Sequence, residues 1–124
     1  MTDSCDFNTE FHFPGLNYCG PGTDLTKRLE ADGKTPKQEY MPVDRIDEVA
    51  LRHDIFYAEH HSARERVTGD DIMLAELYEI PNLTCREKFE RAVIAPLLWL
   101  KRNIIATWLL LIEHCCSIRR AAGS

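Results

Sequence analysis

The sequence predicts a mostly α-helical protein, and three observations support this fold class. Apolar residues recur at helical spacing in separate stretches, while no stretch alternates apolar and polar residues as a half-buried strand does. Prolines and capping residues mark the ends of these stretches. The chain has 124 residues, of which 44% are hydrophobic and 28% are charged. This length and composition suit one globular domain rather than a disordered chain.

The overall charge excludes one class of function. The formal net charge is −5, whereas a nucleic-acid-binding protein needs a basic face that contacts phosphates. We therefore predict no nucleic-acid partner. Contact with a lipid surface would have to come from a local patch.

The N-terminal residues 1–12 are expected to form a flexible leader, because most of them are polar or acidic. No apolar run follows a basic start there, so no secretion signal is visible. The five cysteines are odd in number and show no zinc-finger spacing. We interpret them as free thiols in a reducing compartment.

Residues 13–42 are rich in Gly, Pro, Asn and Asp, which favours an ordered loop. Within it, residues 17–23 place two glycines around a proline, so the backbone can bend until several carbonyls point to one spot. Hard cations such as calcium prefer carbonyl and carboxylate oxygens. Taken alone, however, a Gly-Pro-Gly sequence is usually only a turn.

A first helix is predicted to begin after Asp44, which can cap it, with Asp47 near the positive end of the helix dipole. Its apolar stripe is formed by Ile46, Val49, Ala50, His53, Phe56, Tyr57 and His60. His53 therefore lies in the middle of a buried face, and Asp54 is rotated from it by about 100°. Alone, such a histidine is more often a core residue than a catalyst, and Asp54 is equally suited to the surface.

A second helix is predicted from residue 69 or 70 to about residue 80, where Pro81 ends it. Asp70 falls on the inward stripe of this helix, and Asp71 points about 100° away. A buried carboxylate needs a partner, and His53 is the natural one. The alternative is that Asp70 only caps the second helix.

A third helix is predicted to begin with a capping box, in which Thr84 and Glu87 satisfy each other's backbone donors. Pro96 is predicted to kink or stop this helix. We place the main domain at residues 13–100 and a C-terminal apolar or amphipathic helix at residues 101–124.

The apolar stretch of residues 92–112, which leads into this C-terminal helix, is not predicted to span a membrane. Lys101 and Arg102 interrupt it, and each central cation costs about 2.5–3.5 kcal/mol on insertion. The uninterrupted apolar run, residues 104–112, is too short for about 30 Å of hydrocarbon. Two interpretations remain: a helix packed on the domain or on a second copy, or a helix lying in a membrane surface. The apolar face in question consists of Leu97, Leu100, Ile104, Ile105, Trp108, Leu109, Leu111 and Ile112.

The combination of these features resembles a known family. Residues 16–23 (LNYCGPGT), 42–47 (PVDRID) and 53–57 (HDIFY) resemble the secreted-type phospholipase A2 superfamily. They are similar in particular to its disulfide-poor branch, found in the unique N-terminal region of parvoviral capsid proteins and in related viral and invertebrate proteins. Residues 69–74 and 84–87 also resemble that branch.

The resemblance implies a mostly α-helical fold with two antiparallel core helices that carry the site. It also implies hydrolysis of glycerophospholipids at the sn-2 ester. His53 matches the general base, Asp70 the carboxylate that orients it, and Tyr57 the tyrosine that holds this carboxylate. Because Asp71 is adjacent, it is the fallback for Asp70.

The same resemblance implies a calcium ion as cofactor. The backbone carbonyls of Tyr18, Gly20 and Gly22 match the loop ligands, and Asp54 matches the carboxylate ligand. Calcium would polarise the ester carbonyl and stabilise the developing oxyanion.

One feature departs from the secreted enzymes. Val49 and Ala50 stand where those enzymes carry a cysteine pair, so Cys19 lacks a disulfide partner, and we expect packing or the metal to hold the loop. This favours an intracellular or virion-associated protein, peripheral to membranes, whose partner is a glycerophospholipid surface. Self-association through residues 97–112 is a further expectation. Two other functions remain open: a catalytically weak lipid-binding module, and a helical interaction domain with a structural His and Asp.

Overall fold

The computed structural model describes residues 12–20 and 22–123, so residues 1–11 of the expected flexible leader lie outside the described residues. Within the described part, the regular secondary structure is helical, apart from a single antiparallel bridge between Leu29 and Pro36. The elements are α1 (Leu25–Arg28), the 3-10 helix η1 (Gln38–Tyr40), α2 (Arg45–Glu59), α3 (Ala63–Glu79) and α4 (Cys85–Ala122). The prediction of a mostly α-helical fold is confirmed.

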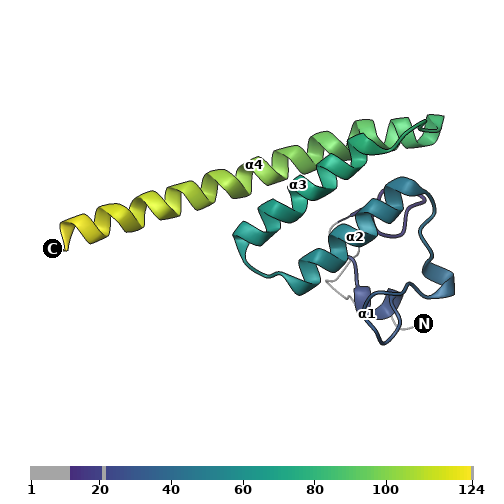
Figure 1. The fold of residues 1–124 in the computed structure, drawn as a ribbon, viewed down its shortest axis with the longest axis horizontal. Helices are drawn as coiled ribbons and strands as arrows, with labels where there is room; N and C mark the ends of the chain where they lie inside the picture. The colour runs from purple at the N-terminus through teal and green to yellow at the C-terminus, as the bar shows by residue number, and fades with distance from the viewer. Residues whose placement is uncertain (1–11, 21, 124) are drawn as a thin grey trace, which may run out of the picture.

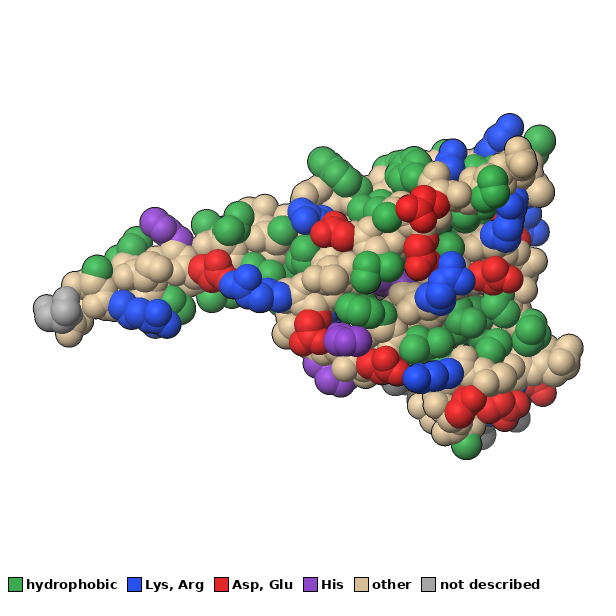
Figure 2. All heavy atoms as spheres, viewed as in Figure 1, with side chains coloured by type: hydrophobic (Ala, Val, Ile, Leu, Met, Phe, Trp, Pro, Cys, Tyr) green, Lys and Arg blue, Asp and Glu red, His purple; other side chains and the backbone are tan. Residues whose placement is uncertain are grey.

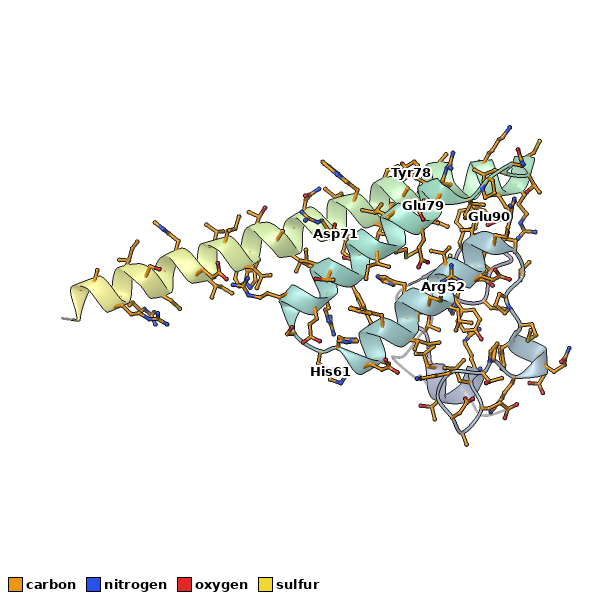
Figure 3. The ribbon with its side chains drawn as sticks, viewed as in Figure 1. Arg52, His61, Asp71, Tyr78, Glu79 and Glu90 are labelled. Carbon is orange, nitrogen blue, oxygen red and sulfur yellow. The ribbon has the colours of Figure 1, made fainter. Side chains whose placement is uncertain are left out.

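The three long helices form an antiparallel succession in which α3 contacts both α2 and α4 (Figure 1). Arg52 of α2 reaches across to α3, where its Nε donates to Glu76 Oε2 at 3.0 Å (Figure 3). The N-terminal loops cover the other side of α2, so that the core joins loop and helix residues. Its buried apolar members are Leu16, Tyr18, Cys19, Leu29, Ile46, Val49, Ala50, Leu51, Met73, Leu77, Ala95 and Leu98.

Helix α2 begins where the sequence predicted. Asp44 is its N-cap, and its carboxylate accepts a hydrogen bond from the backbone N–H of Asp47. The predicted stripe then turns Ile46, Val49 and Ala50 into the core. The helix thus brings His53 to the inside of the domain, with only 9% of its side chain exposed.

Helix α3 begins at Ala63, so the predicted start at residue 69 or 70 is wrong. Ser62 caps it by accepting from the backbone N–H of Glu65, and its hydroxyl donates to the Glu65 carboxylate. Gly69 lies inside this helix at a close approach to α2, where a Cβ would lie only 2.7 Å from the Phe56 ring, so a side chain is disfavoured there. Asp70 therefore lies well inside α3, which excludes the alternative that it only caps this helix.

Helix α4 starts with the predicted capping box of Thr84 and Glu87. Of the two effects expected of Pro96, a stop does not occur, since α4 continues to Ala122. A proline inside a helix costs about 3 kcal/mol. Ala95, directly before Pro96, and Leu98, two residues after it, are buried in the core, and their burial offsets this cost. The C-terminal segment therefore continues α4 without a break.

The second half of α4 projects from the domain and carries many exposed apolar side chains (Figures 1 and 2). Among the described residues, α4 is the one helix long and apolar enough to cross a membrane, and only 11% of its most apolar window is buried. Its large exposed apolar residues are Phe89, Leu97, Trp99, Leu100, Ile104, Trp108, Leu110, Leu111, Ile112 and Ile118. Of the predicted apolar face, Ile105 and Leu109 are only partly covered.

Candidate functional site

The centre of the site is a contact between α2 and α3. His53 Nε2 lies 2.7 Å from Asp70 Oδ1, and the Asp70 side chain is fully buried. The Tyr57 hydroxyl, one helical turn beyond His53, donates to the same oxygen. The structure thus brings together the three residues to which the resemblance assigned the general base and its supports.

The neighbouring Asp71 faces a different environment. Its side chain is 51% exposed and receives two hydrogen bonds from Arg102 of α4, at 2.8 and 3.2 Å (Figure 3). The helical phase inferred from the sequence therefore separated the inward carboxylate from the outward one correctly. Of the two candidate carboxylates, Asp70 contacts His53 and Asp71 contacts Arg102.

The hydrogen bond to Asp70 determines which nitrogen of His53 is basic. An ionised carboxylate only accepts, so Nε2 carries the proton and Nδ1 of the neutral ring has a free lone pair. Nδ1 lies 3.8 Å from Asp54 Oδ1. Burial alone would lower the pKa of His53, but its interactions with Asp54 and Asp70 outweigh burial and raise it.

Asp70 stays ionised despite its burial. Desolvation acts to raise its pKa, but hydrogen bonds from His53 and Tyr57, together with the Lys101 ammonium, outweigh desolvation and hold the pKa below its usual value. His53 is thus the proton acceptor, and the Asp70 carboxylate, whose ionised form is favoured, fixes the tautomer of the His53 ring.

The glycine-rich loop is held by a residue that the sequence did not predict as part of the site. Asp47 is fully buried, and its carboxylate accepts from the backbone N–H groups of Asn17, Tyr18 and Val43 at 2.8–3.1 Å. Cys19 is buried with a free thiol. The loop is therefore fixed by hydrogen bonds and packing without a disulfide. This agrees with the expectation that packing would hold the loop in place of the missing disulfide.

A weak signal for Asp47 did exist in the sequence. It lies three residues after the helix cap Asp44, and an acidic residue there points back toward the chain that precedes the helix. The sequence alone did not show that the distant loop residues Asn17 and Tyr18 would also donate to this carboxylate.

The predicted metal ligands line one cavity of about 840 Å³ together with His53. Tyr18, Gly20 and Gly22 contribute from the loop, and Asp54 contributes from α2. Gly22 has a φ of +77°, which a residue with a side chain rarely adopts. Pro21, between the two glycines, lies outside the described residues.

The Asp54 carboxylate fits a cation. Its Oδ2 is buried and has no hydrogen-bond partner, and burial raises the pKa of this carboxyl. A buried anionic oxygen without a donor is unfavourable unless a positive charge satisfies it. Among the described residues, no three His, Cys, Asp or Glu side chains form a metal cluster, so a cation at Asp54 would draw on backbone oxygens, as calcium does.

The rest of the cavity is mainly apolar. Its size falls in the range of small-molecule sites, about 300–1,000 Å³. Two cations, Arg66 and Lys101, also reach its wall. The apolar lining comes from Phe13, Leu25, Ala50, Ala58, Met73, Val93, Ile94, Leu97 and Leu98.

Lys101 is the second residue at the site that the sequence did not predict. We grouped it with the C-terminal helix, yet its Nζ lies 3.3 Å from Asp70 Oδ1 and 2.8 Å from the Tyr57 hydroxyl. No spacing rule within one sequence links this lysine of α4 to Asp70 on α3 or to Tyr57 on α2, 44 positions earlier.

The model of one protein family matches the chain, and its description is a phospholipase A2-like domain. The match covers residues 9–101, about three quarters of the 124 residues, and includes every site residue discussed above. No curated protein and no solved structure matches. A family-level match of this extent supports phospholipase-type chemistry and confirms the resemblance inferred from the loop and the His-Asp motif. The chain belongs to the phospholipase A2-like domain family.

Proposed function

We propose that this protein is a calcium-dependent phospholipase A2, which hydrolyses the sn-2 ester of glycerophospholipids. The observation that carries this proposal is the hydrogen bond between His53 Nε2 and buried Asp70, at 2.7 Å. It leaves Nδ1 as a base on the wall of a cavity that also contains Asp54, whose Oδ2 has no partner. A positioned base beside a candidate cation site and an apolar cavity suits ester hydrolysis of a lipid.

In this proposal His53 is the general base. Its Nδ1 takes a proton from a water molecule as the water oxygen attacks the sn-2 carbonyl carbon. The bond between this carbon and the glycerol oxygen then breaks, and His53 returns the proton to the leaving oxygen, which yields a fatty acid and a lysophospholipid. Asp70 stabilises the transient imidazolium, and Tyr57 holds Asp70. A positioned base of this kind contributes about 10²–10⁴-fold to the rate.

Asp54 and the backbone carbonyls of Tyr18, Gly20 and Gly22 are the proposed calcium ligands. When bound, calcium supplies Lewis-acid polarisation of the ester carbonyl and charge stabilisation of the oxyanion. Asp47 holds the Tyr18 end of this loop against α2, so the loop is partly preorganised.

The proposed partner is a glycerophospholipid membrane surface, to which an intracellular or virion-associated protein would bind peripherally. The apolar wall of the cavity and the exposed apolar face of α4 meet at Leu97, which lines the cavity and is 62% exposed. An exposed apolar strip that continues from the cavity along one helix suits a lipid interface.

The test is release of fatty acid from phosphatidylcholine vesicles, measured with calcium or with EGTA. We expect the unaltered protein to show calcium-dependent release, and His53→Ala and Asp54→Asn to lose about 10²-fold or more of it. Glu48→Gln is a matched control, because Glu48 lies on the same helix but is exposed. If the unaltered protein released no more fatty acid than His53→Ala, the proposal would be wrong.

A second candidate function is a lipid-binding module with little catalysis, and the exposure of the projecting part of α4 favours it. Leu110 is 67% exposed and Trp108 is 63% exposed. If calcium-dependent release is absent but the His53→Ala protein still sediments with vesicles, this second function is supported. Loss of sedimentation in Trp108→Glu would then locate the contact on α4, whereas a dimer that dissociates in this variant would identify self-association.

A further inference from the structure

Lys101 connects α4 to the residues that hold His53. Its Nζ lies 2.8 Å from the Tyr57 hydroxyl oxygen and 3.3 Å from Asp70 Oδ1, and it sits 4.6 Å from the centre of the Tyr57 ring. The Lys101 side chain is 44% exposed, whereas Asp70 is fully buried. The amine therefore lies between solvent and the buried carboxylate.

The chemistry of these groups sets the direction of the hydrogen bonds. An ammonium group only donates, and a tyrosine hydroxyl has one proton. Because Lys101 donates to the Tyr57 oxygen, the Tyr57 proton remains available for Asp70, which is where the structure directs it. Without Lys101, this hydroxyl could rotate toward the backbone oxygen of Arg66, 3.4 Å away.

Lys101 also balances charge. A buried carboxylate is costly unless a positive charge and hydrogen bonds compensate it. Of the groups that contact Asp70 Oδ1, His53 and Tyr57 are neutral in the state ready for catalysis, and Lys101 carries a full charge. Lys101 therefore lets Asp70 stay ionised beside a neutral imidazole.

Arg102, the residue after Lys101, holds α4 against α3 beside the site. Arg102 donates two hydrogen bonds to Asp71, and its Nη1 donates a third to Asn103 Oδ1 at 3.2 Å. Two consecutive cations of α4 thus meet two consecutive carboxylates of α3, one pair at the site and one pair outside the cavity. This arrangement provides a matched control for any effect on helix packing.

We infer that Lys101 is a positioning residue of the hydrolytic site, which holds Tyr57 and Asp70 in the arrangement that orients His53. This inference rests on the proposed function for its kinetic consequence, but the arrangement itself can be measured without catalysis. Lys101 acts through Asp70 and Tyr57 and is assigned no contact with the reacting ester.

The kinetic experiment compares Lys101→Met, Lys101→Arg and Arg102→Met on a short-chain phosphatidylcholine below its critical micelle concentration, so that membrane binding plays no part. We expect Lys101→Met to lower kcat about tenfold, the lower end of the loss when a supporting partner is removed, while KM stays within about twofold. Lys101→Arg keeps the charge and should restore most of kcat. Arg102→Met should retain kcat within about twofold, because exposed ion pairs contribute little.

Combining substitutions tests the route of the effect. If Lys101 acts through Tyr57, then Tyr57→Phe and Lys101→Met together should lower kcat by less than the product of their separate effects. Independent, multiplicative effects would overturn the inference. So would a rise in KM at unchanged kcat, which would identify Lys101 as a substrate-binding residue, or an equal loss in Arg102→Met, which would indicate helix packing alone.

A spectroscopic measurement separates this inference from the proposed function. In protein with isotope-labelled histidine, NMR reports which nitrogen of His53 carries the proton. We expect the Nε2–H form in the unaltered protein and in Arg102→Met, and a shifted or exchange-broadened signal in Lys101→Met. If the unaltered protein proves inactive, the proposed function fails, but this signal still decides the role of Lys101, and an unchanged signal in Lys101→Met overturns it.

Discussion

Asp47→Asn is the change that most directly tests how the loop is held without a disulfide. One Asp47 oxygen accepts from Asn17 and Tyr18, and the other accepts from Asn17 and Val43. An amide replaces one of these oxygens with an NH₂ group. In either orientation of the amide, a backbone N–H of Tyr18 or Val43 then faces another donor.

The expected loss can be estimated from these contacts. A hydrogen bond to a charged group contributes about 1.5–3 kcal/mol, and a buried donor left without a partner costs about 1–3 kcal/mol. Because the two figures describe overlapping parts of one event, we expect a loss of about 2–4 kcal/mol in the free energy of unfolding. For a domain of this size, about 1 kcal/mol corresponds to roughly 4 °C in Tm, so Tm should fall by roughly 8–16 °C.

The measurement is urea denaturation followed by circular dichroism, with Glu48→Gln as the control. Glu48 is the next residue of α2 and is exposed, so its free energy of unfolding should change by less than about 0.5 kcal/mol. A calcium titration of both variants then tests whether the loop keeps its arrangement. We expect Asp47→Asn to bind calcium more weakly than Glu48→Gln does. Equal stability of Asp47→Asn and the control would refute the view that this carboxylate anchors the loop.

Three further predictions concern the His53–Asp70 pair, the buried carboxyl group of Glu90 and the projecting part of α4. Asp70→Asn should lower kcat about 10²-fold or more, whereas Asp71→Asn, at the exposed position beside it, should leave kcat within about twofold in the same assay. Burial raises the pKa of Glu90 from 4.5 to about 7; the unfolded chain then loses its proton first, so stability should fall as pH rises from about 4.5 to about 7, and a shallower fall in Glu90→Gln by thermal melting would confirm this group as the cause. Trp108→Glu should reduce sedimentation with phosphatidylcholine vesicles and leave Tm unchanged, because this side chain is 63% exposed; undiminished sedimentation would exclude this part of α4 as the contact.

The central pair of the site could be predicted because it depends on local periodicity. The 3.6-residue repeat placed His53 inside α2 and distinguished Asp70 from Asp71 on α3. The pairing of these two helices then needed only a short connection between them, since consecutive antiparallel helices pack together. The predicted start of α3 is wrong because a glycine such as Gly69 often marks a helix boundary, whereas here Ser62 supplies the cap and Gly69 lies inside the helix.

Residues that connect distant elements could not be predicted in this way. The partners of Asp47 lie about 30 residues earlier in the loop, and Lys101 meets Tyr57 from 44 residues away. For Pro96 the local rule predicts a kink or a stop, and the stop does not occur, because α4 continues through this residue. In each case the outcome depends on how α4 or the loop lies against α2 and α3, and periodicity within one element does not specify that.

The absence of a disulfide at Cys19 has a consequence for how this site responds to its surroundings. The loop is fixed to α2 by Asp47, and the support of His53 is completed by Lys101 from α4, so both halves of the site rely on charged groups rather than on an oxidised cysteine pair. Cys19, Cys85, Cys115 and Cys116 are all free thiols. Reducing agents should therefore leave Tm and fatty-acid release unchanged. If a disulfide stabilised the loop, reduction would lower both Tm and the rate of fatty-acid release. A marked fall in Tm and in fatty-acid release on reduction would show that a covalent link, and not Asp47, holds the loop in place.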